Sequence, residues 1–258
     1  MSHASIYNRV RRMLTGWNKA DLINCIGELH GYRNYLEICN AISGYRFSEI
    51  DRGIFSVCHR IGYRSPSLRH SDGRGYDFCT TGLDSSEGIG AIRAKGVIYD
   101  IMLVDSWHDY ETSFRDLSDA IGLLSPNGTV VVHDCLPAQE TLAQMPFAGG
   151  EWSGVTYRAF LDFVVERALD YRTVDTDFGC GIIRKGIAAA PPSPERRALL
   201  EGWRAIGDDH HAAFRFLHQH KQLWNVISVN DFLAEETRAA RGLRNGAGAD
   251  TKVRRQVA

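Results

Sequence analysis

Acidic and histidine side chains follow two apolar stretches in the middle of the 258-residue sequence. Asp105 and His108 come after one stretch, and His133 and Asp134 end the next. Carboxylates and imidazoles bind divalent metals, and a histidine with a near-neutral pKa also serves as a general base. If the two stretches are neighbouring strands, these four side chains converge at one sheet edge. Because side chains alternate along a strand, we expect His133 and Asp134 to face opposite ways.

Each of these residues also has a purely structural interpretation. Asp105 or Asp109 can cap the helix that follows, and His133 can be a semi-buried histidine with a hydrogen-bond partner. Two such strand ends in one fold nevertheless favour a functional site.

Two further segments have polar groups suited to a nucleotide-like ligand. The first predicted strand, 35–39, is followed by a turn and a short helix that begins near Gly44, and a helix N-terminus binds carboxylates or phosphates. Asp84, followed by Ser85, could accept a hydrogen bond from an adenine amine or cap a helix that begins near Glu87. Both interpretations of Asp84 stay open.

The elements that must position these residues alternate between β-rich runs and helical patterns, which is typical of a parallel sheet covered on both faces. The predicted strands are 35–39, 54–58, 76–80, 99–105, 129–134, 171–175 and 180–184, and the strongest predicted helices are 110–124 and 155–168. Segment 62–75, rich in Gly, Ser, Pro and Arg, stands where a helix would be expected. Its arginines, with Arg60, either bind an anionic group or belong to a solvated loop.

Composition excludes several classes of protein. Thirty Lys and Arg balance 31 Asp and Glu, so no global charge attracts nucleic acid or an anionic membrane. Six scattered cysteines without a CxxC pair predict reduced thiols and a cytoplasmic protein. No run of 18 apolar residues predicts a membrane span, and the basic N-terminus has helical spacing rather than a signal-peptide core.

The sequence predicts four regions. They are an N-terminal helical cap (1–30), a central α/β domain (31–186), a C-terminal helical extension (187–240) and a disordered tail (241–258). The extension has enough apolar surface to dock on the core or on another subunit, and a homo-oligomer stays open.

Four segments together resemble the class I S-adenosylmethionine-dependent methyltransferases, in particular the branch of small-molecule and polysaccharide-cluster O-methyltransferases. They are residues 35–38 (YLEI), 99–111 (YDIMLVDSWHDYE), 126–135 (PNGTVVVHDC) and 174–181 (VDTDFGCG). The resemblance covers residues 31–185. It implies a Rossmann-like α/β fold with a seven-stranded methyltransferase sheet, mostly parallel with an antiparallel last strand, plus N- and C-terminal helical additions. The implied cofactor is S-adenosyl-L-methionine, bound over the first four strand ends.

The resemblance also implies roles for individual residues. Those implied to bind the cofactor are Glu37, Cys39, Asn40, Gly44, Asp84, Ser85, Asp105 and Trp107. Those implied to orient or deprotonate the acceptor are His108, His133 and Asp134, and Asp105 and Asp134 are candidate ligands of a divalent metal such as Mg²⁺. Glu151, Trp152 and Tyr157 are expected to form the substrate wall.

Two departures from the family pattern leave alternatives open. Cys39 stands where a glycine is usual, and the second strand is expected to end in Cys58, His59 and Arg60 without an acidic residue for the ribose. The predicted function is O-methylation of a small-molecule or saccharide acceptor. One alternative is a methyltransferase-fold binding or interaction protein without turnover. The other is a metal-dependent hydroxylase-like or hydrolytic enzyme on the same scaffold.

Overall fold

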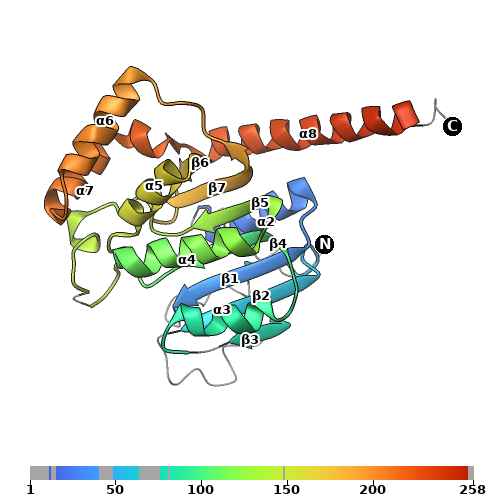
Figure 1. The fold of residues 1–258 in the computed structure, drawn as a ribbon, viewed down its shortest axis with the longest axis horizontal. Helices are drawn as coiled ribbons and strands as arrows, with labels where there is room; N and C mark the ends of the chain where they lie inside the picture. Colours follow the sequence, from blue (N-terminus) through green and yellow to red (C-terminus); the bar gives the residue numbers. More distant parts are fainter. Residues whose placement is uncertain are drawn as a thin grey trace.

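The computed structural model describes residues 12, 16–40, 49–63, 76–80, 82–147 and 149–254, with side chains up to residue 241. These residues form an eight-stranded sheet with helices on both faces (Figure 1). The strands are β1 (Asn34–Asn40), β2 (Val57–Tyr63), β3 (Phe78–Thr80), β4 (Tyr99–Asp105), β5 (Leu124–Val132), β6 (Leu169–Val174), β7 (Cys180–Ala188) and β8 (Val226–Ile227). The helices are α2 (Lys19–His30), α3 (Ser85–Arg93), α4 (Tyr110–Leu123), α5 (Thr156–Glu166), α6 (Pro194–Ala205), α7 (His210–Gln219) and α8 (Val229–Arg254), with short 3-10 helices η2 (Glu140–Leu142) and η3 (Lys221–Trp224). None of the described helices is both long and apolar enough to cross a membrane.

The strand order across the sheet is β3-β2-β1-β4-β5-β7-β6-β8. Strands β1 to β5 pair in parallel, whereas β7 is antiparallel to both β5 and β6. The order therefore reverses between β1 and β4, which is where open α/β sheets bind ligands. The predicted fold class is confirmed, with one addition: β8 comes from the C-terminal extension and pairs in parallel with β6.

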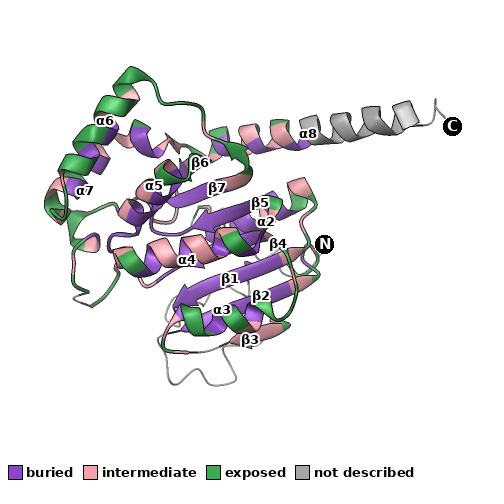
Figure 2. Cartoon of the chain, viewed as in Figure 1, coloured by how far each residue is buried: buried purple, intermediate pink, exposed green. Residues whose placement is uncertain are grey.

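Figure 2 shows that the central strands are buried along most of their length. Their alternating side chains belong to two hydrophobic cores. In β4, Met102 and Val104 belong to the core that includes residues of α3, α4 and α5. Ile101 and Leu103 belong to the second core, with apolar residues of α2 and Phe232 of α8. Because both faces are covered, β4 is apolar from Ile101 to Val104 and ends in Asp105, whereas β1 and β2 bury Glu37 and Arg60 within the strands.

The C-terminal extension docks on this chain's own core. Trp203 of α6 and Trp224 of η3 are buried, and Trp224 donates from Nε1 to the carbonyl of Tyr157 at 3.1 Å. Trp203 donates from Nε1 to Asp162 Oδ1 at 2.7 Å. α8 continues to Arg254, into the segment 241–258 for which composition predicts disorder.

The second strand differs from its predicted bounds, 54–58, and this changes which residues lie at its carboxyl end. β2 runs from Val57 to Tyr63, because a turn with Ile54 N–H bonded to the Asp51 carbonyl at 2.9 Å precedes it. The expectation that β2 ends in Cys58, His59 and Arg60 is therefore wrong, since these residues lie inside the strand. The carboxyl end of β2 is Tyr63, and residues 64–75, with the other arginines of the predicted anion-binding segment, lie outside the described residues.

Candidate active site

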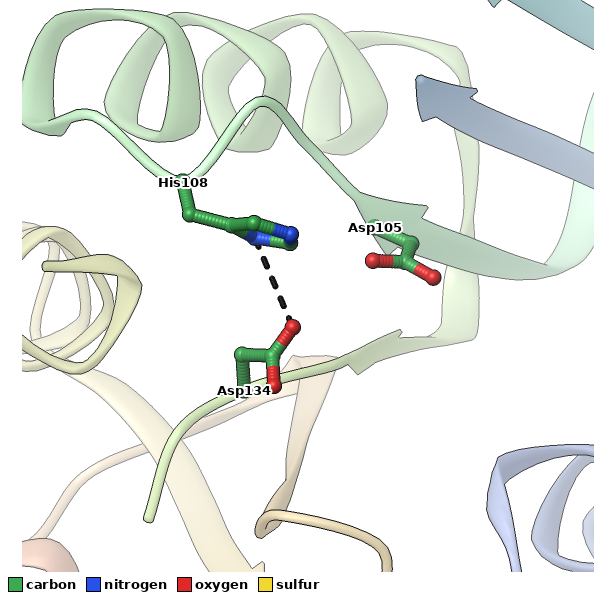
Figure 3. A group of neighbouring side chains, drawn as sticks. All are labelled: Asp105, His108 and Asp134. Atoms are coloured by element: carbon green, nitrogen blue, oxygen red, sulfur yellow. Dashed lines mark ion pairs between the residues drawn. The ribbon is translucent and has the colours of Figure 1, made fainter. Parts of the chain in front are cut away.

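A cavity of about 200 Å³ lies at the carboxyl ends of β1, β4 and β5. It is therefore at the reversal of strand order, where the fold predicts a ligand. Its lining includes eight residues predicted from the sequence to be functional: Asn40, Asp105, Trp107, His108, His133, Asp134, Glu151 and Trp152. Figure 3 shows Asp105 and His108, from the end of β4 and the loop after it, facing a common space with Asp134, which follows β5.

Asp105 and His108 are placed by the transition from β4 to α4. Asp105 is the last residue of β4 and is 2% exposed. Asp109 caps α4 by accepting from the Thr112 backbone N–H at 2.7 Å, which confirms the structural interpretation for Asp109. With Asp109 turned toward the helix, His108 is left on the cavity side of the turn.

His133 and Asp134 do not face opposite ways, so that expectation is wrong. β5 ends at Val132, and Asp134 adopts a left-handed conformation with φ of 62°. Strand alternation therefore does not apply here, and Asp134 Oδ2 lies 2.9 Å from His133 Nδ1. The same oxygen lies 3.4 Å from His108 Nδ1, while Ser153 donates to Oδ1 at 2.8 Å. Asp134 thus lies between the two histidines.

Two charged residues not predicted from the sequence complete the cluster. Lys19, the first residue of α2, places Nζ 2.6 Å from Asp105 Oδ2 and 3.3 Å from His133 Nδ1. Asp177, in the loop before β7, accepts from the Lys19 backbone N–H at 3.0 Å and lies 3.6 Å from His133 Nε2. Little in the sequence marks these two residues as functional. Lys19 is a lysine at the start of a helix, and Asp177 lies in one of the segments that resemble methyltransferases.

The charges in this cluster stabilise one another. Burial disfavours the ammonium of Lys19, but Asp105 and Asp177 outweigh burial and raise its pKa. Burial also opposes ionisation of Asp105, yet Lys19 and His133 keep its pKa well below the usual value. For His133, burial is outweighed by Asp134 and Asp105, which hold its pKa well above the usual value. The raised pKa favours the protonated form of His133.

Three aromatic side chains form one wall of the cavity. Trp107, Phe147 and Trp152 have ring centroids 5.0 to 5.5 Å apart, and Trp152 also contacts the His108 ring at 5.3 Å. Glu151 and Trp152 line the cavity as expected for a substrate wall. Tyr157 does not, because it is buried against Trp203 and Trp224.

The residues predicted for the cofactor's amino-acid end lie along β1. Asn40 lines the cavity and donates to the Ser106 carbonyl at 3.1 Å. Glu37 is buried below the cavity and accepts from Tyr35 at 3.2 Å and Tyr76 at 2.5 Å. Cys39 is buried beside Arg60, whose Nε lies 3.1 Å from its Sγ. Gly44 lies outside the described residues.

Arg60 does not lie in a loop, where it is expected to bind an anionic group or face solvent. It is in the middle of β2, only 2% exposed, and its Nε lies 3.9 Å from Glu37 Oε1. A guanidinium in this environment compensates a buried carboxylate.

Asp84 and Ser85 are not in the cavity lining. Asp84 caps α3 by accepting from the Ser86 N–H at 2.9 Å, which confirms the capping interpretation, and it pairs with Arg115 at 2.9 Å. Ser85 donates to the buried carboxylate of Asp116.

Asp116 has two further donors. Tyr63 donates to its Oδ2 at 3.0 Å and Ser106 at 2.9 Å, so the ends of β2 and β4 are tied to α4. The hydroxyl of Tyr63 in turn accepts from the Trp107 backbone N–H at 2.6 Å. The network therefore fixes the turn that carries Trp107 and His108.

The predicted metal ligands lie together but already have cationic partners. Asp105, His108 and Asp134 each offer one ligand atom, all within 4.8 Å of one another. Lys19 Nζ already contacts Asp105, and the His133 imidazolium contacts Asp134. A divalent ion here would share a carboxylate with an ammonium only a few ångströms away, which is strongly repulsive in a buried site. With Lys19 in this position, the group does not fit a divalent ion.

Comparisons with known proteins give matches only among solved structures. No family model and no curated protein matches the chain. An O-methyltransferase from Bacillus cereus in complex with SAH has a TM-score of 0.48 and 15% identity, over 70% of this chain and 87% of its own. The O-methyltransferase TomG from Streptomyces achromogenes, in complex with SAM, has a TM-score of 0.46 and 14% identity, over 74% and 91%. The SAH-bound Podospora anserina methyltransferase PaMTH1 has a TM-score of 0.46 and 16% identity, over 71% and 88%.

Proposed function

We propose that this protein is an S-adenosylmethionine-dependent methyltransferase that acts on a hydroxyl group of a small molecule. The observation that carries the proposal is the position of the charged cavity. It lies at the carboxyl edge of β1, β4 and β5, in a sheet whose order reverses between β1 and β4 and whose β7 is antiparallel. The sequence motifs that resemble methyltransferases converge on this edge.

Asp105 supplies a group that fits the cofactor's amino-acid end. Its Oδ1 is buried and has no hydrogen-bond partner among the described residues, while Lys19 keeps the carboxylate ionised. An ionised acceptor that lacks a donor fits the ammonium of a bound amino acid. Asn40, on the neighbouring strand, adds an amide at the same edge.

His108 is the base of the proposed reaction. Its Nδ1 lies 3.4 Å from Asp134 Oδ2 and 3.4 Å from Thr156 Oγ1. With the Nδ1 proton held by these oxygens, Nε2 is left to take the acceptor's proton. Asp134 orients the ring, and His133 balances the charge of Asp134.

S-Adenosylmethionine supplies a methyl group on a sulfonium: the acceptor oxygen's electron pair forms the new O–C bond, and the C–S pair stays on sulfur as a thioether. The chain aligns the acceptor, excludes water with Trp107, Phe147 and Trp152, and takes the hydroxyl proton on His108. This aromatic wall fits a flat acceptor such as a phenol, and the polar residues opposite also suit a saccharide hydroxyl. Saccharides, like phenols, can pack against aromatic side chains, so both kinds of acceptor should be tested.

Isothermal titration with S-adenosylhomocysteine tests the cofactor assignment directly. We expect binding by the wild type and a roughly tenfold or greater loss in Asp105→Asn, which removes one charged acceptor. Asp109→Asn is the matched control, because Asp109 caps α4 and does not line the cavity. Absence of binding at millimolar ligand would overturn the enzyme proposal.

Methyl transfer is tested separately with radiolabelled S-adenosylmethionine and a panel of simple phenols and monosaccharides. Transfer that is lost in His108→Ala supports the proposal. Cofactor binding without transfer to any panel member would favour the binding-protein alternative.

A further inference from the structure

Lys19 occupies an unusual position for a lysine. It begins α2, and its side chain is directed to the buried carboxyl edge of the sheet, where the residue is 5% exposed. The helix start is fixed by a capping box, in which Asn18 accepts from the Asp21 N–H and Asp21 accepts from the Asn18 N–H. α2 itself packs into the second core through Leu22, Ile23 and neighbouring apolar residues. The position of Lys19 is therefore set by a rigid, docked element.

The charged groups that act most strongly on its ammonium belong to the candidate active site. Nζ lies 2.6 Å from Asp105 Oδ2, and Asp177 and Asp134 add favourable charge from neighbouring loops. The His133 ring faces Lys19, with Nδ1 3.3 Å from Nζ. Burying a lysine is costly unless a carboxylate compensates it, so this arrangement requires Asp105 to remain ionised.

Lys19 supplies the kind of charge that a divalent metal would supply. A metal bound to Asp105 and Asp134 would neutralise the carboxylates and place positive charge beside the acceptor. Here the Lys19 ammonium lies 2.6 Å from Asp105 Oδ2, and the His133 ring lies 2.9 Å from Asp134 Oδ2.

We infer that Lys19 is a resident cation that replaces a divalent metal in this site. It is a positioning residue, since it acts through Asp105 and His133 rather than by lining the cavity. The positive charge of the site then belongs to the Lys19 side chain, at the first residue of α2. The inference concerns the site of the proposed function, but its test does not depend on methyl transfer.

Manganese binding to the full chain, measured by titration with electron paramagnetic resonance, tests this inference. We expect the wild type to bind Mn²⁺ weakly or not at all at millimolar concentration. Lys19→Ala should gain a site with at least about tenfold tighter affinity, because it leaves Asp105 and Asp134 without the ammonium. Asp105→Asn introduced into Lys19→Ala should remove that site.

Lys19→Arg is the conservative control, since it keeps the charge and should not gain Mn²⁺ affinity. Thermal unfolding checks that each variant is folded, and if Lys19→Ala is not, Lys19→Gln takes its place. Tight Mn²⁺ binding by the wild type that Asp105→Asn abolishes would overturn the inference, as would no gain of binding in a folded Lys19 variant. Cofactor titration reports separately on the proposed function.

Discussion

His108 Nδ1 and Asp134 Oδ2 lie 3.4 Å apart, although one residue follows β4 and the other follows β5. The pair is possible because β4 and β5 are parallel neighbours whose carboxyl ends meet at one edge. Asp134 adopts a left-handed backbone conformation, and its side chain lines the cavity beside His108. An imidazole oriented by a carboxylate is the arrangement that a general base requires.

Replacing His108 by Ala should lower kcat for methyl transfer by roughly 10² to 10⁴, the usual contribution of a general base. Affinity for S-adenosylhomocysteine should change little, because His108 is assigned to the acceptor end. Initial rates with the acceptor found in the panel, together with isothermal titration, separate the two effects. His211→Ala is the control, since His211 is an exposed histidine. A kcat unchanged in His108→Ala would exclude it as the base.

The buried carboxyl of Asp116 should make stability depend on pH. Burial raises its pKa to about 6, against the lowering effect of hydrogen bonds from Ser85, Ser106 and Tyr63. A pKa raised in the folded state means that folding favours the protonated form, so this contribution to stability is present at low pH. It is lost as the pH rises through about 6.

Asp116→Asn removes this proton-binding group. The difference in unfolding free energy between wild type and variant should therefore change by about 3 kcal/mol between about pH 4 and about pH 7, with the wild type relatively more stable at the lower pH. Urea denaturation at both pH values measures it, and the other titrating groups cancel in the difference. An equal difference at both pH values would contradict the prediction.

Gly154 allows the chain to pass directly beside His108. Its φ is 51°, and a Cβ at this position would lie 2.2 Å from the His108 carbonyl oxygen. Gly154→Ala should therefore destabilise the fold by more than about 2 kcal/mol and displace His108. Gly96→Ala, at a φ of 64° with open space around it, should cost only about 1 kcal/mol. Thermal and chemical unfolding give the loss of unfolding free energy in each variant. Gly154→Ala combines a close contact with backbone strain, whereas Gly96→Ala has the strain alone. Similar losses in the two variants would argue against a role for the contact.

Glu236 fastens α8 to the sheet. It is 1% exposed and pairs with His30 of α2 at 2.6 Å and with Arg184 of β7. Glu236→Ala leaves a partly buried arginine uncompensated and should cost about 3 kcal/mol of unfolding free energy. The adjacent Glu235→Ala breaks only a half-exposed pair with Arg172 and should cost less than about 1 kcal/mol. Urea denaturation of both variants tests the contrast, which equal costs would refute.

The sequence predicts those parts of the site that follow from strand order. The bounds of β4 match the prediction, and Asp105 and His108 meet His133 and Asp134 as expected, because residues at the ends of adjacent parallel strands share an edge. Capping by Asp84 and Asp109 is also predictable, since a side-chain oxygen before a helix satisfies its first free N–H groups.

The remaining features depend on tertiary contacts that local patterns do not encode. The left-handed backbone of Asp134 breaks the alternation expected for a strand. Lys19 and Asp105 are separated by 86 residues, and the lysine is buried only because α2 docks with its N-terminus toward the site. A lysine at a helix start is ordinarily solvated, so composition and spacing favour the wrong environment for Lys19.

The reversed direction of β7 has a consequence for how the site is assembled. Parallel strands bring only their exits to the catalytic edge, whereas an antiparallel strand brings its entrance. The loop 175–179, which leads into β7, therefore lies at the same edge as the ends of β4 and β5. It places Asp177 beside His133 and the backbone of Lys19. Leu136 N–H and Cys135 N–H bond to the carbonyls of Phe178 and Gly179, which fixes this loop against the turn after β5. The inverted strand β7 therefore brings the loop 175–179 to α2 of the N-terminal cap, so the charged cluster requires both α2 and this loop to be docked on the sheet.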